Sequence, residues 1–594
     1  MSRIAIVKKE NCKGGIDCPY LCMSSCPVNR TGKECINKIN RNFPESKVSI
    51  DEKLCIGCGI CVKRCPFETI SIINLPEEIK SAPVHRYGNN GFALYSLPIP
   101  IFGKVVGIIG RNGIGKSTAV KILSGVLAPN FGDYNKKPTE SAVENWNSLI
   151  EFYKGTEAQV FFERVKAGKI RTSYKIQPVE MIPKFYNGTV RALLEKADEK
   201  KNLKKIAEKL DLAEIMDRNV KDISGGELQR VAIAASSLKD ANLYIFDEPS
   251  SYLDAKQRVK VSKFIRELAD EKTAVIVIEH DLIILDFMTE LIHIMYGKED
   301  CYGVCSLPKT TRIGINIYLS GFLKEENMRF RDSEIKFASK PPIDIKRQVE
   351  LVSWNGIKKN LGEFSLSAPH GTLYRHQTIG VLGENGIGKT TFVKILAGIL
   401  ESEGSVSSNV RVSYKPQYLT SDSNELVMTI LSEAVQRHTA DLIEPLALKQ
   451  FLTKRLREIS GGELQRVAIA ECLSRDAELY LLDEPSAYLD VEQRLVVSKT
   501  IKDFAERKGS TVLVVDHDLM FIDYLSERLI VFDGKPALSG NVSEVKSMSD
   551  GMNAFLMDLG ITLRRDLESN RPRINKEDSR KDREQKAEGK LYYD

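Results

Sequence analysis

Long hydrophobic runs are missing from this chain of 594 residues. A helix that spans a membrane needs about 20 mostly apolar residues, and no stretch of even about 18 such residues occurs. The first apolar run ends before Lys8 and has only four residues, which is too short for the core of a secretory signal. We therefore expect a cytoplasmic protein without a membrane-spanning segment.

A strong excess of charge of either sign is also absent. The 86 Lys and Arg residues nearly balance the 80 Asp and Glu residues, which leaves a net charge of +6. This mild balance does not indicate a general binder of polyanions, so contact with nucleic acid should depend on local basic patches.

Cysteine is nearly absent after residue 65. Only Cys301, Cys305 and Cys472 follow that point, whereas nine of the twelve cysteines lie between Cys12 and Cys65. Reducing conditions in the cytosol disfavour a disulfide framework. The concentration of cysteines therefore predicts a small metal-binding module at the start of the chain.

Two cysteine motifs in this module each end in Cys-Pro. In the second motif, Cys55, Cys58, Cys61 and Cys65 have the spacing that holds a cubane iron–sulfur cluster in bacterial-type ferredoxins. In those proteins the fourth cysteine binds the neighbouring cluster. The first motif, which covers residues 12–26, is a looser version of the same pattern.

Exchanging the fourth ligands predicts two 4Fe-4S clusters. The predicted ligands are Cys12, Cys18, Cys22 and Cys65 for cluster 1, and Cys55, Cys58, Cys61 and Cys26 for cluster 2. Cys35 is then spare, although the irregular spacing of the first motif leaves the choice among Cys12, Cys18, Cys22 and Cys35 open. Tetrahedral zinc is the competing interpretation because thiolates bind both metals, although zinc modules usually pair two C-x2-C units.

The rest of the chain contains the same series of motifs twice. GRNGIGKS begins at Gly110 and GENGIGKT at Gly383, and each is followed by the same eleven residues, SGGELQRVAIA, and then by DEPS-x-YLD. Two ordered copies of these motifs predict two ATP-processing cassettes.

Each glycine-rich loop is expected to hold phosphate. Its backbone N–H groups surround phosphate oxygens, the following helix adds its positive N-terminal dipole, and the lysine adds a full charge. The predicted phosphate-binding residues are Gly110, Asn112, Gly113, Gly115, Lys116, Ser117 and Thr118 in the first cassette, and Gly383, Asn385, Gly386, Gly388, Lys389, Thr390 and Thr391 in the second.

Acidic residues after two apolar strands complete the predicted metal and water sites. Asp247 and Asp483 should hold Mg2+ together with the hydroxyls of Ser117 and Thr390. Glu248 and Glu484 come next in the chain, where a carboxylate can orient or deprotonate the attacking water. A buried structural role for these glutamates is the alternative.

Histidine and glutamine recur at matching places in the two cassettes. His280 and His517 each follow a β-branched strand, and Gln177 and Gln417 each follow the residues SYK-x. A single histidine at a strand end is usually structural. The recurrence favours a contact of the histidines with the γ-phosphate, and of the glutamines with Mg2+ and the attacking water.

Aromatic residues precede the first core strand of each cassette. Tyr87 and Phe92 occupy this place in the first cassette and Trp354 in the second, where they are expected to stack on adenine. A role in the hydrophobic core is the alternative.

The first cassette has an insertion. Lys116 and Gln177 are 61 positions apart, whereas Lys389 and Gln417 are 28 apart. Residues of about 144–171 read as two short amphipathic helices around Gly155 with interleaved basic and aromatic residues. This composition suits contact with RNA, and a structural arm with its own small core is an equal alternative.

The repeated motifs resemble those of ABC-type ATPases. In that family two nucleotide-binding domains face each other head to tail, and each ATP lies between one phosphate loop and the signature motif of the other domain. ATP would close the pair and hydrolysis would open it. The resemblance implies two composite sites, one in which Lys116 faces Ser460, Gly462 and Glu463, and one in which Lys389 faces Ser224, Gly226 and Glu227.

Over essentially its whole length the chain resembles the ABC-type ribosome-recycling factors of archaea and eukaryotes, also called the RNase L inhibitor family. The segments that carry the resemblance are LCIGCGIC, LPIP, both SGGELQR copies, DEPSSYLD, DEPSAYLD and RPRINK. The resemblance implies a monomeric ATPase that splits ribosomes with a release-factor or Pelota-like partner. It would then stay on the small subunit, in contact with rRNA and ribosomal proteins, towards initiation.

The predicted fold class is α/β, with two ABC-type P-loop nucleotide-binding domains in tandem after an N-terminal ferredoxin-like α+β iron–sulfur domain. The predicted parts are the head (1–75), the first cassette (76–300), hinge 1 (301–343), the second cassette (344–545), and hinge 2 with a charged tail (546–594). We expect the residues after Lys576 to be solvated. Two other functions remain open: a twin ATPase subunit of a membrane transporter, and an iron–sulfur redox protein regulated by ATP.

Overall fold

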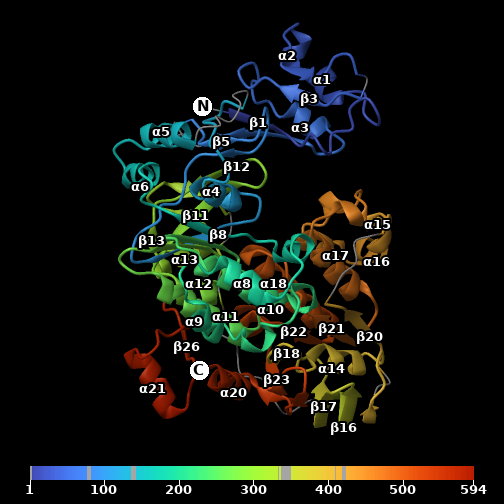
Figure 1. Cartoon of the computed structure of the whole chain (residues 1–594). Helices are drawn as coiled ribbons and strands as arrows, with labels where there is room; N and C mark the ends of the chain where they lie inside the picture. The colour runs from blue at the N-terminus through green and yellow to red at the C-terminus, as the bar shows by residue number, and fades with distance from the viewer. Residues whose placement is uncertain are drawn as a thin grey trace.

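The structure is a computed structural model, and it describes residues 3–43, 45–75, 82–134, 142–331, 334–335, 337, 349–407, 410–417 and 423–593. The cysteine-rich head lies at one end of the molecule, above the first cassette, and the second cassette lies beside and below the first (Figure 1). Among the described residues, no helix combines the length and the apolar character needed to cross a membrane.

The head is a small α+β unit built around its cysteines. Two antiparallel strand pairs form it, β1 (Arg3–Val7) with β4 (Ile70–Asn74) and β2 (Ile36–Lys38) with β3 (Val48–Ile50). The short helices are α1 (Leu21–Ser25), α2 (Pro27–Arg30) and α3 (Ile60–Arg64). Buried cysteines and aliphatic side chains share one core, so the predicted ferredoxin-like head is confirmed.

The first cassette is built on a sheet with five parallel strands in the order β11, β7, β10, β9, β8. Its central strands are continuous apolar runs because helices cover both faces of a parallel sheet. The strands are β5 (His85–Arg86), β6 (Ala93–Leu94), β7 (Val105–Ile109), β8 (Thr172–Lys175), β9 (Leu243–Asp247), β10 (Ala274–Ile278), β11 (Leu291–Lys298), β12 (Tyr302–Cys305) and β13 (Lys309–Thr310).

The second cassette repeats this order as β23, β18, β22, β21, β20, and a long antiparallel hairpin widens its sheet. The strands are β16 (Glu350–Leu361), β17 (Phe364–Tyr374), β18 (Thr378–Leu382), β19 (Glu403–Ser407), β20 (Val412–Lys415), β21 (Leu479–Asp483), β22 (Thr511–Val515), β23 (Arg528–Lys535), β24 (Ser539–Val542) and β25 (Lys546–Ser547). The predicted tandem of α/β cassettes is therefore confirmed.

Equivalent helices follow equivalent strands in the two cassettes. The helices of the first are α4 (Lys116–Leu123), α7 (Ile182–Phe185), α8 (Val190–Ala197), α9 (Leu203–Lys209), α10 (Gly225–Leu238), α11 (Ala255–Leu268) and α12 (Leu282–Met288). Those of the second are α14 (Lys389–Leu396), α15 (Val427–Ile430), α16 (Ser432–Arg437), α17 (Gly461–Ser474), α18 (Val491–Lys508) and α19 (Leu519–Leu525). The phosphate loops lead directly into α4 and α14.

The insertion forms the two expected helices, α5 (Ala142–Phe152) and α6 (Glu157–Lys166), on either side of Gly155. Its aromatic residues turn inward, however. Trp146 stacks on Phe162 with ring centres 6.0 Å apart, and Phe162 is fully buried. These side chains share one hydrophobic cluster with core residues of the first cassette such as Ile108 and Ile122. Packing against the cassette therefore explains the aromatic residues, and neither a separate core of the arm nor stacking on RNA bases does.

The hinges cross between the cassettes. Hinge 1 contains β14 (Phe322–Leu323), β15 (Met328–Arg329) and α13 (Thr311–Ser320), and hinge 2 contains α20 (Met548–Leu559), β26 (Leu563–Arg565), β27 (Pro572–Ile574) and α21 (Arg580–Glu588). Asp566 of hinge 2 accepts hydrogen bonds from Arg312 and Asn316 of α13. Arg571 and Arg573 bind Asp286 of the first cassette, which ties hinge 2 to the opposite lobe.

The prediction of a solvated tail after Lys576 holds for most of α21, whose residues are largely exposed, but it is wrong for Asp582, Leu591 and Tyr592. Asp582 on α21 is buried and accepts a hydrogen bond of 2.7 Å from Thr562. Leu591 and Tyr592 are buried in the main core, where the Tyr592 hydroxyl donates to Asp523. The surrounding charged residues hid this small apolar anchor in the sequence.

The head is docked on the first cassette through the loop between β5 and β6. The side chain of Asn90 is completely buried and binds the backbone of Ala5 and Ile50 in the head. Beside it, Arg86 donates a hydrogen bond of 2.9 Å to Glu52. The predicted boundary at 75/76 lies where the described residues stop at Leu75, and that at 343/344 lies outside the described residues.

Candidate nucleotide and iron–sulfur sites

Both phosphate loops hold their lysine inside the loop. Lys116 Nζ donates to the carbonyls of Gly110 and Arg111 at 2.9 and 2.7 Å, and Lys389 Nζ donates to the carbonyl of Gly383 at 3.0 Å. Burial lowers the pKa of Lys389 to about 8. A desolvated ammonium group of this kind gains from an anionic phosphate, so the geometry suits the predicted binding role.

The predicted magnesium residues lie at the ends of equivalent strands, and in the second cassette they are in contact. Asp247 and Asp483 are the last residues of β9 and β21. Thr390 Oγ1 donates to Asp483 Oδ2 at 2.7 Å. In the first cassette Asp247 instead accepts a bond of 3.2 Å from the Tyr174 hydroxyl. A hydroxyl and a carboxylate in contact match the ligands that a nucleotide-bound Mg2+ takes from protein.

Glutamine, glutamate and histidine are brought together in both cassettes. Gln177 Nε2 donates to Glu248 Oε1 at 2.7 Å, and His280 Nε2 lies 3.4 Å from the same oxygen. In the second cassette the corresponding distances, from Gln417 and His517 to Glu484, are 2.7 and 3.6 Å.

The glutamate of each trio is held in an unusual backbone conformation. Glu248 has φ of 48° and Glu484 of 47°, in the left-handed region that non-glycine residues seldom adopt. Burial alone would raise the pKa of Glu248, but His280, Lys116 and Gln177 together lower it to about 2. Such a carboxylate is a weak base, which favours orientation of the water over its deprotonation.

Two further residue types hold the backbone of the Asp-Glu pair in each cassette, and the sequence analysis did not include them. Lys175 and Lys415 are buried and donate to the carbonyls of Asp247 and Asp483 at 2.9 and 2.8 Å. The glutamines of the two LQR segments, Gln229 and Gln465, donate to the carbonyls of Glu248 and Glu484. The same lysine and glutamine occur at matching positions of both cassettes, and this recurrence could have identified them from the sequence.

The signature motifs begin their helices as expected. Ser224 caps α10 and Ser460 caps α17, each in a capping box with the glutamate three residues later, Glu227 or Glu463. Each signature packs on the D-loop of its own cassette, which is the Leu-Asp pair at 253–254 or 489–490. A Cβ on Gly226 or Gly462 would lie 3.0 or 2.9 Å from the carbonyl oxygen of the tyrosine just before that pair, Tyr252 or Tyr488.

Each D-loop in turn contacts the phosphate loop of the other cassette. Asp490 accepts a hydrogen bond of 3.2 Å from Asn112 N–H, and Asp254 accepts one of 2.9 Å from Asn385 N–H. Each phosphate loop therefore faces the opposite cassette near its signature, which is the arrangement that two composite sites require.

The aromatic residues follow the prediction in one cassette only. The Tyr87 hydroxyl lies 3.2 Å from that of Thr118 in α4, and Phe92 packs on Gly115 of the phosphate loop. Trp354 is instead 2 % exposed and packs edge-on against Phe392 in the core. Phe364 takes the place of Phe92 against Gly388. We therefore replace Trp354 by Phe364 as the candidate aromatic residue of the second site.

The cysteines of the head surround two separate cavities. One is lined by Cys12, Cys18, Cys22 and Cys65, and the other by Cys26, Cys55, Cys58 and Cys61. These are the two sets that exchange of the fourth ligand predicts. Gly57 and Gly59 have φ of 75° and 69°, which lets the loop from Cys55 to Cys61 curl tightly around its cavity.

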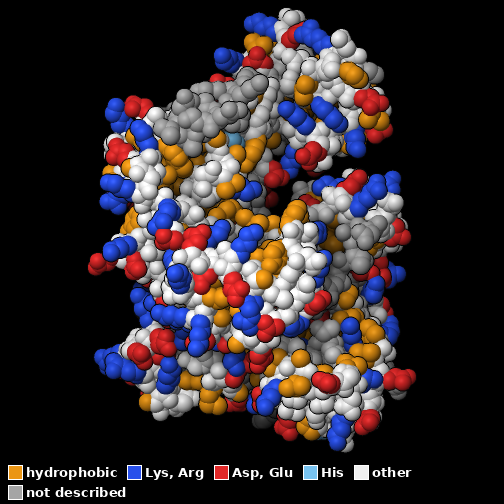
Figure 2. All heavy atoms as spheres, in the orientation of Figure 1, with side chains coloured by type: hydrophobic (Ala, Val, Ile, Leu, Met, Phe, Trp, Pro, Cys, Tyr) orange, Lys and Arg blue, Asp and Glu red, His pale blue; other side chains and the backbone are white. Residues whose placement is uncertain are grey.

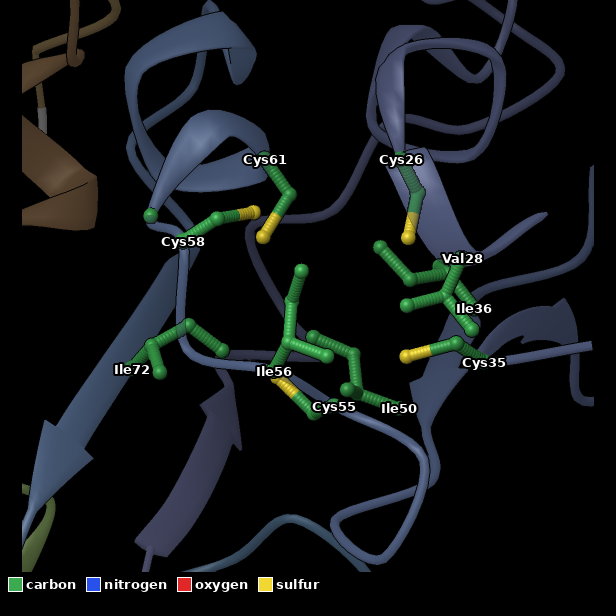
Figure 3. Close-up of a pocket in the computed structure, with 11 residues that line it drawn as sticks. Cys26, Val28, Cys35, Ile36, Ile50, Cys55, Ile56, Cys58, Cys61 and Ile72 are labelled. Atoms are coloured by element: carbon green, nitrogen blue, oxygen red, sulfur yellow. The ribbon is translucent and has the colours of Figure 1, made fainter. Parts of the chain in front are cut away.

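Cys35 lies in the second of these cavities. Figure 3 shows its sulfur facing the space that Cys26, Cys55, Cys58 and Cys61 surround. The thiol is 3.8 Å from the carbonyl oxygen of Asp51, within reach of a weak hydrogen bond. In the described part of the chain, no three His, Cys, Asp or Glu side chains converge on a point that would suit one metal ion. The thiols do line two spaces, so their chemistry and spread fit a cluster of several iron atoms.

Comparison with known families agrees with the division into cassettes and head. Residues 102–251 and 366–487 match the family described as "ABC transporter", and residues 48–71 match the family described as "4Fe-4S binding domain".

Similar proteins span the entire chain. An uncharacterized ABC transporter ATP-binding protein of Methanocaldococcus jannaschii is 50% identical over 100% of this chain and 97% of its own length. Translation initiation factor RLI1 of Saccharomyces cerevisiae is 40% identical over 100% of this chain and 98% of its own.

Among solved structures, one described as a "Model of ribosome-bound archaeal Pelota and ABCE1" matches with a TM-score of 0.91 and 48% identity. It covers 100% of this chain and 99% of the matched chain. Because these relatives are similar over the full length of the chain, the chain belongs to the ABCE1 family, also known as the RLI1 or RNase L inhibitor family.

Proposed function

We propose that this chain is a ribosome-recycling ATPase that separates ribosomal subunits after termination or stalling and stays on the small subunit towards initiation. The observation that carries the proposal is the full-length match, head included, to a chain described with ribosome-bound Pelota. ATP hydrolysis follows from the two ABC cassettes.

In this function the two composite sites act as a clamp. The loops with Lys116 and Lys389 bind ATP, and Asp247 and Asp483 help to hold Mg2+. Glu248 and Glu484 orient the water, with the paired glutamines and histidines holding the carboxylates in place. Because each signature helix points its N-terminus at a γ-phosphate, ATP favours closure and hydrolysis releases it.

The head would hold two 4Fe-4S clusters, with the ligand sets that line its two cavities. Bound clusters would cross-link three short helices and two strand pairs that share only a small core. We expect the cluster-bound head to be rigid. A rigid head can transmit displacement to a ribosomal subunit. Cys35 is not required as a ligand because four other thiols serve its cavity.

Contacts between the head and the first cassette connect the clamp to this body. Lys8 of the head forms an ion pair of 2.7 Å with Asp300, and Asp300 N–H donates to the carbonyl of Gly113 in the phosphate loop. A change in this loop can therefore reach the head through two contacts.

The ribosome, chiefly its small subunit, and a release-factor or Pelota-like protein are the proposed partners. On the face seen in Figure 2, basic and acidic side chains are intermixed over both cassettes, so rRNA contact would depend on local patches. The insertion offers one such patch, since Lys154, Arg164, Lys166 and Lys169 are exposed on it.

Splitting of purified ribosomes by the iron-loaded chain tests the proposal. Subunits should separate only when ATP and the Pelota-like partner are both present, as followed by light scattering and gradient sedimentation. A chain that hydrolyses ATP but neither sediments with small subunits nor separates them would contradict the proposed function. Co-purification with membranes, or cluster reduction coupled to ATP, would favour the transporter or redox alternatives.

A further inference from the structure

Two ion pairs join the cassettes beside the phosphate loops, and their charges are reversed. Arg111, the second residue of the first loop, lies 2.5 Å from Glu492 of the second cassette. Glu384, at the same position of the second loop, lies 2.7 Å from Lys256 of the first cassette. Lys256 and Glu492 are also equivalent, because each lies two residues after a D-loop aspartate.

The surroundings of the two ion pairs are otherwise nearly the same. In both, the D-loop aspartate accepts from the backbone N–H of the asparagine next to the charged loop residue, Asn112 or Asn385. The segments also share the sequence pattern G-x-NGIGK on one side and YLD-x-x-QR on the other. The two halves of the interface are thus copies of each other in which the basic and acidic residues have changed sides.

This reversal distinguishes correct from incorrect pairing. If two first cassettes met in the same geometry, Arg111 would face Lys256, and if two second cassettes met, Glu384 would face Glu492. Like charges in contact disfavour an interface, whereas opposite charges favour it. We propose that the reversed ion pairs form a pairing code, which makes each cassette complementary to the other and disfavours pairing of like cassettes from two copies of the chain.

Partial burial of these side chains strengthens the interaction between their charges. Arg111 and Glu492 are 36% and 13% exposed, so water screens their charges only in part. Glu492 also accepts a hydrogen bond of 3.0 Å from Arg331 of hinge 1. Because Glu492 serves both contacts, the test should leave it unchanged. Replacing attraction by repulsion at one such site should weaken closure about tenfold.

Two full-length variants with no change in net charge separate the code from other effects. In the exchanged variant, Arg111→Glu/Glu384→Arg, both contacts within the chain become repulsive and both contacts between like cassettes become attractive. In the inverted variant, Lys256→Glu/Glu384→Arg, both contacts at the phosphate loops stay attractive within the chain, and the contacts between like cassettes become attractive too. The new carboxylate also lies near Asp558 of α20, which is 3.6 Å from Lys256 in the wild type. Both variants carry the same change at Glu384, so a direct effect of that residue on nucleotide binding would appear in both.

Retention of a non-hydrolysable ATP analogue measures closure without ribosomes, so the result does not depend on the proposed splitting activity. We expect the exchanged variant to lose the analogue roughly 100-fold faster than wild type, about tenfold per site, and the inverted variant to stay within about threefold. Equal loss in both variants, or no loss in the exchanged one, would overturn the code.

Sedimentation with the same analogue tests the discrimination between copies. Wild type should remain monomeric, and the exchanged variant should self-associate as its concentration rises. The inverted variant should stay monomeric as well, because its own two cassettes attract each other and their covalent link gives them a high effective concentration. If the exchanged variant released the analogue yet stayed monomeric, the ion pairs would stabilise closure without selecting the partner, and the code would be refuted.

Two single variants, measured by the same retention of the ATP analogue, provide a test in case the double variants misfold. Lys256→Glu alone makes the contact with Glu384 repulsive, together with the weaker one to Asp558 of α20 at 3.6 Å. Lys260→Glu, one turn later on α11, makes the same charge change at a residue that pairs with Asp211 inside the first cassette. Only the first should shorten retention, by about tenfold. Equal effects of the two substitutions would assign the loss to net charge and overturn the proposal.

Discussion

Removing the side chain of Asn90 should detach the head from the first cassette without harming the nucleotide sites. Asn90 Nδ2 donates to the carbonyls of Ala5 and Ile50 at 2.9 and 3.0 Å, and its Oδ1 accepts from Ile50 N–H at 2.8 Å. The residue has φ of 55°, so glycine is the substitution that removes the side chain without adding backbone strain.

The size of the effect follows from these three bonds. Each buried hydrogen bond contributes about 1 kcal/mol, so Asn90→Gly should weaken docking by about 3 kcal/mol, a shift of roughly 100-fold in the docking equilibrium. Asn90→Asp keeps the acceptor but places a carboxylate beside two carbonyl oxygens, and it should be at least as disruptive. Asn90→Ala adds strain at the positive φ.

Hydrogen exchange and a splitting assay would measure the consequence. Amides of β1 and β3 should lose protection in Asn90→Gly, and the ATPase rate without ribosomes should stay near that of wild type while splitting slows at least tenfold. As a matched control, Asn130→Gly removes contacts of the same kind to the backbone of Arg86 within the first cassette. Normal splitting by an Asn90→Gly protein with an unprotected head would refute the idea that docking transmits force.

Three further predictions concern the sites and the tail. Glu248→Gln and Glu484→Gln should each keep ATP binding and slow hydrolysis at their own site at least tenfold. The double variant should accumulate in the closed state on small subunits. Free release of ATP by the double variant, in a nucleotide-trapping assay, would argue against closure. Iron analysis of anaerobically purified protein should give about eight irons per chain, Cys58→Ser should lose one cluster and Cys35→Ser neither, whereas zinc without iron would contradict the assignment. Tyr592→Ala should cost about 3 kcal/mol and lower the melting temperature because a buried ring is lost, and an unchanged transition would contradict docking of the tail.

The motifs predicted the catalytic parts of both cassettes because their chemistry requires fixed spacing on a short strand–loop–helix segment. Glu248 and Gln177 meet although 71 positions separate them, and recurrence of the same residues in the second cassette made that contact foreseeable. The position of Trp354 was not foreseeable by counting, because the long hairpin of β16 and β17 moves the aromatic contact to Phe364.

Contacts between distant parts of the chain left no local pattern. Arg111 and Glu492 look like ordinary surface charges in the sequence, and only the head-to-tail docking of the cassettes makes them partners. Leu591 and Tyr592 were hidden for a similar reason, since the charged residues before them indicate a solvated segment. Burial of two apolar side chains outweighs that local preference.

The contacts also make the two nucleotide sites unequal with respect to the head. Asp300 contacts the phosphate loop of the first cassette and binds Lys8 of the head, so movement of Gly113 is transmitted directly. At the matching place in the second loop, Gly386 contacts the backbone of Ala537 within its own cassette. We therefore expect closure at the first site to act on the head through these two contacts, and closure at the second site to act on it by moving the lobe. The contacts from Gly113 through Asp300 to Lys8 would thus make the two chemically similar sites differ in their effect on the head.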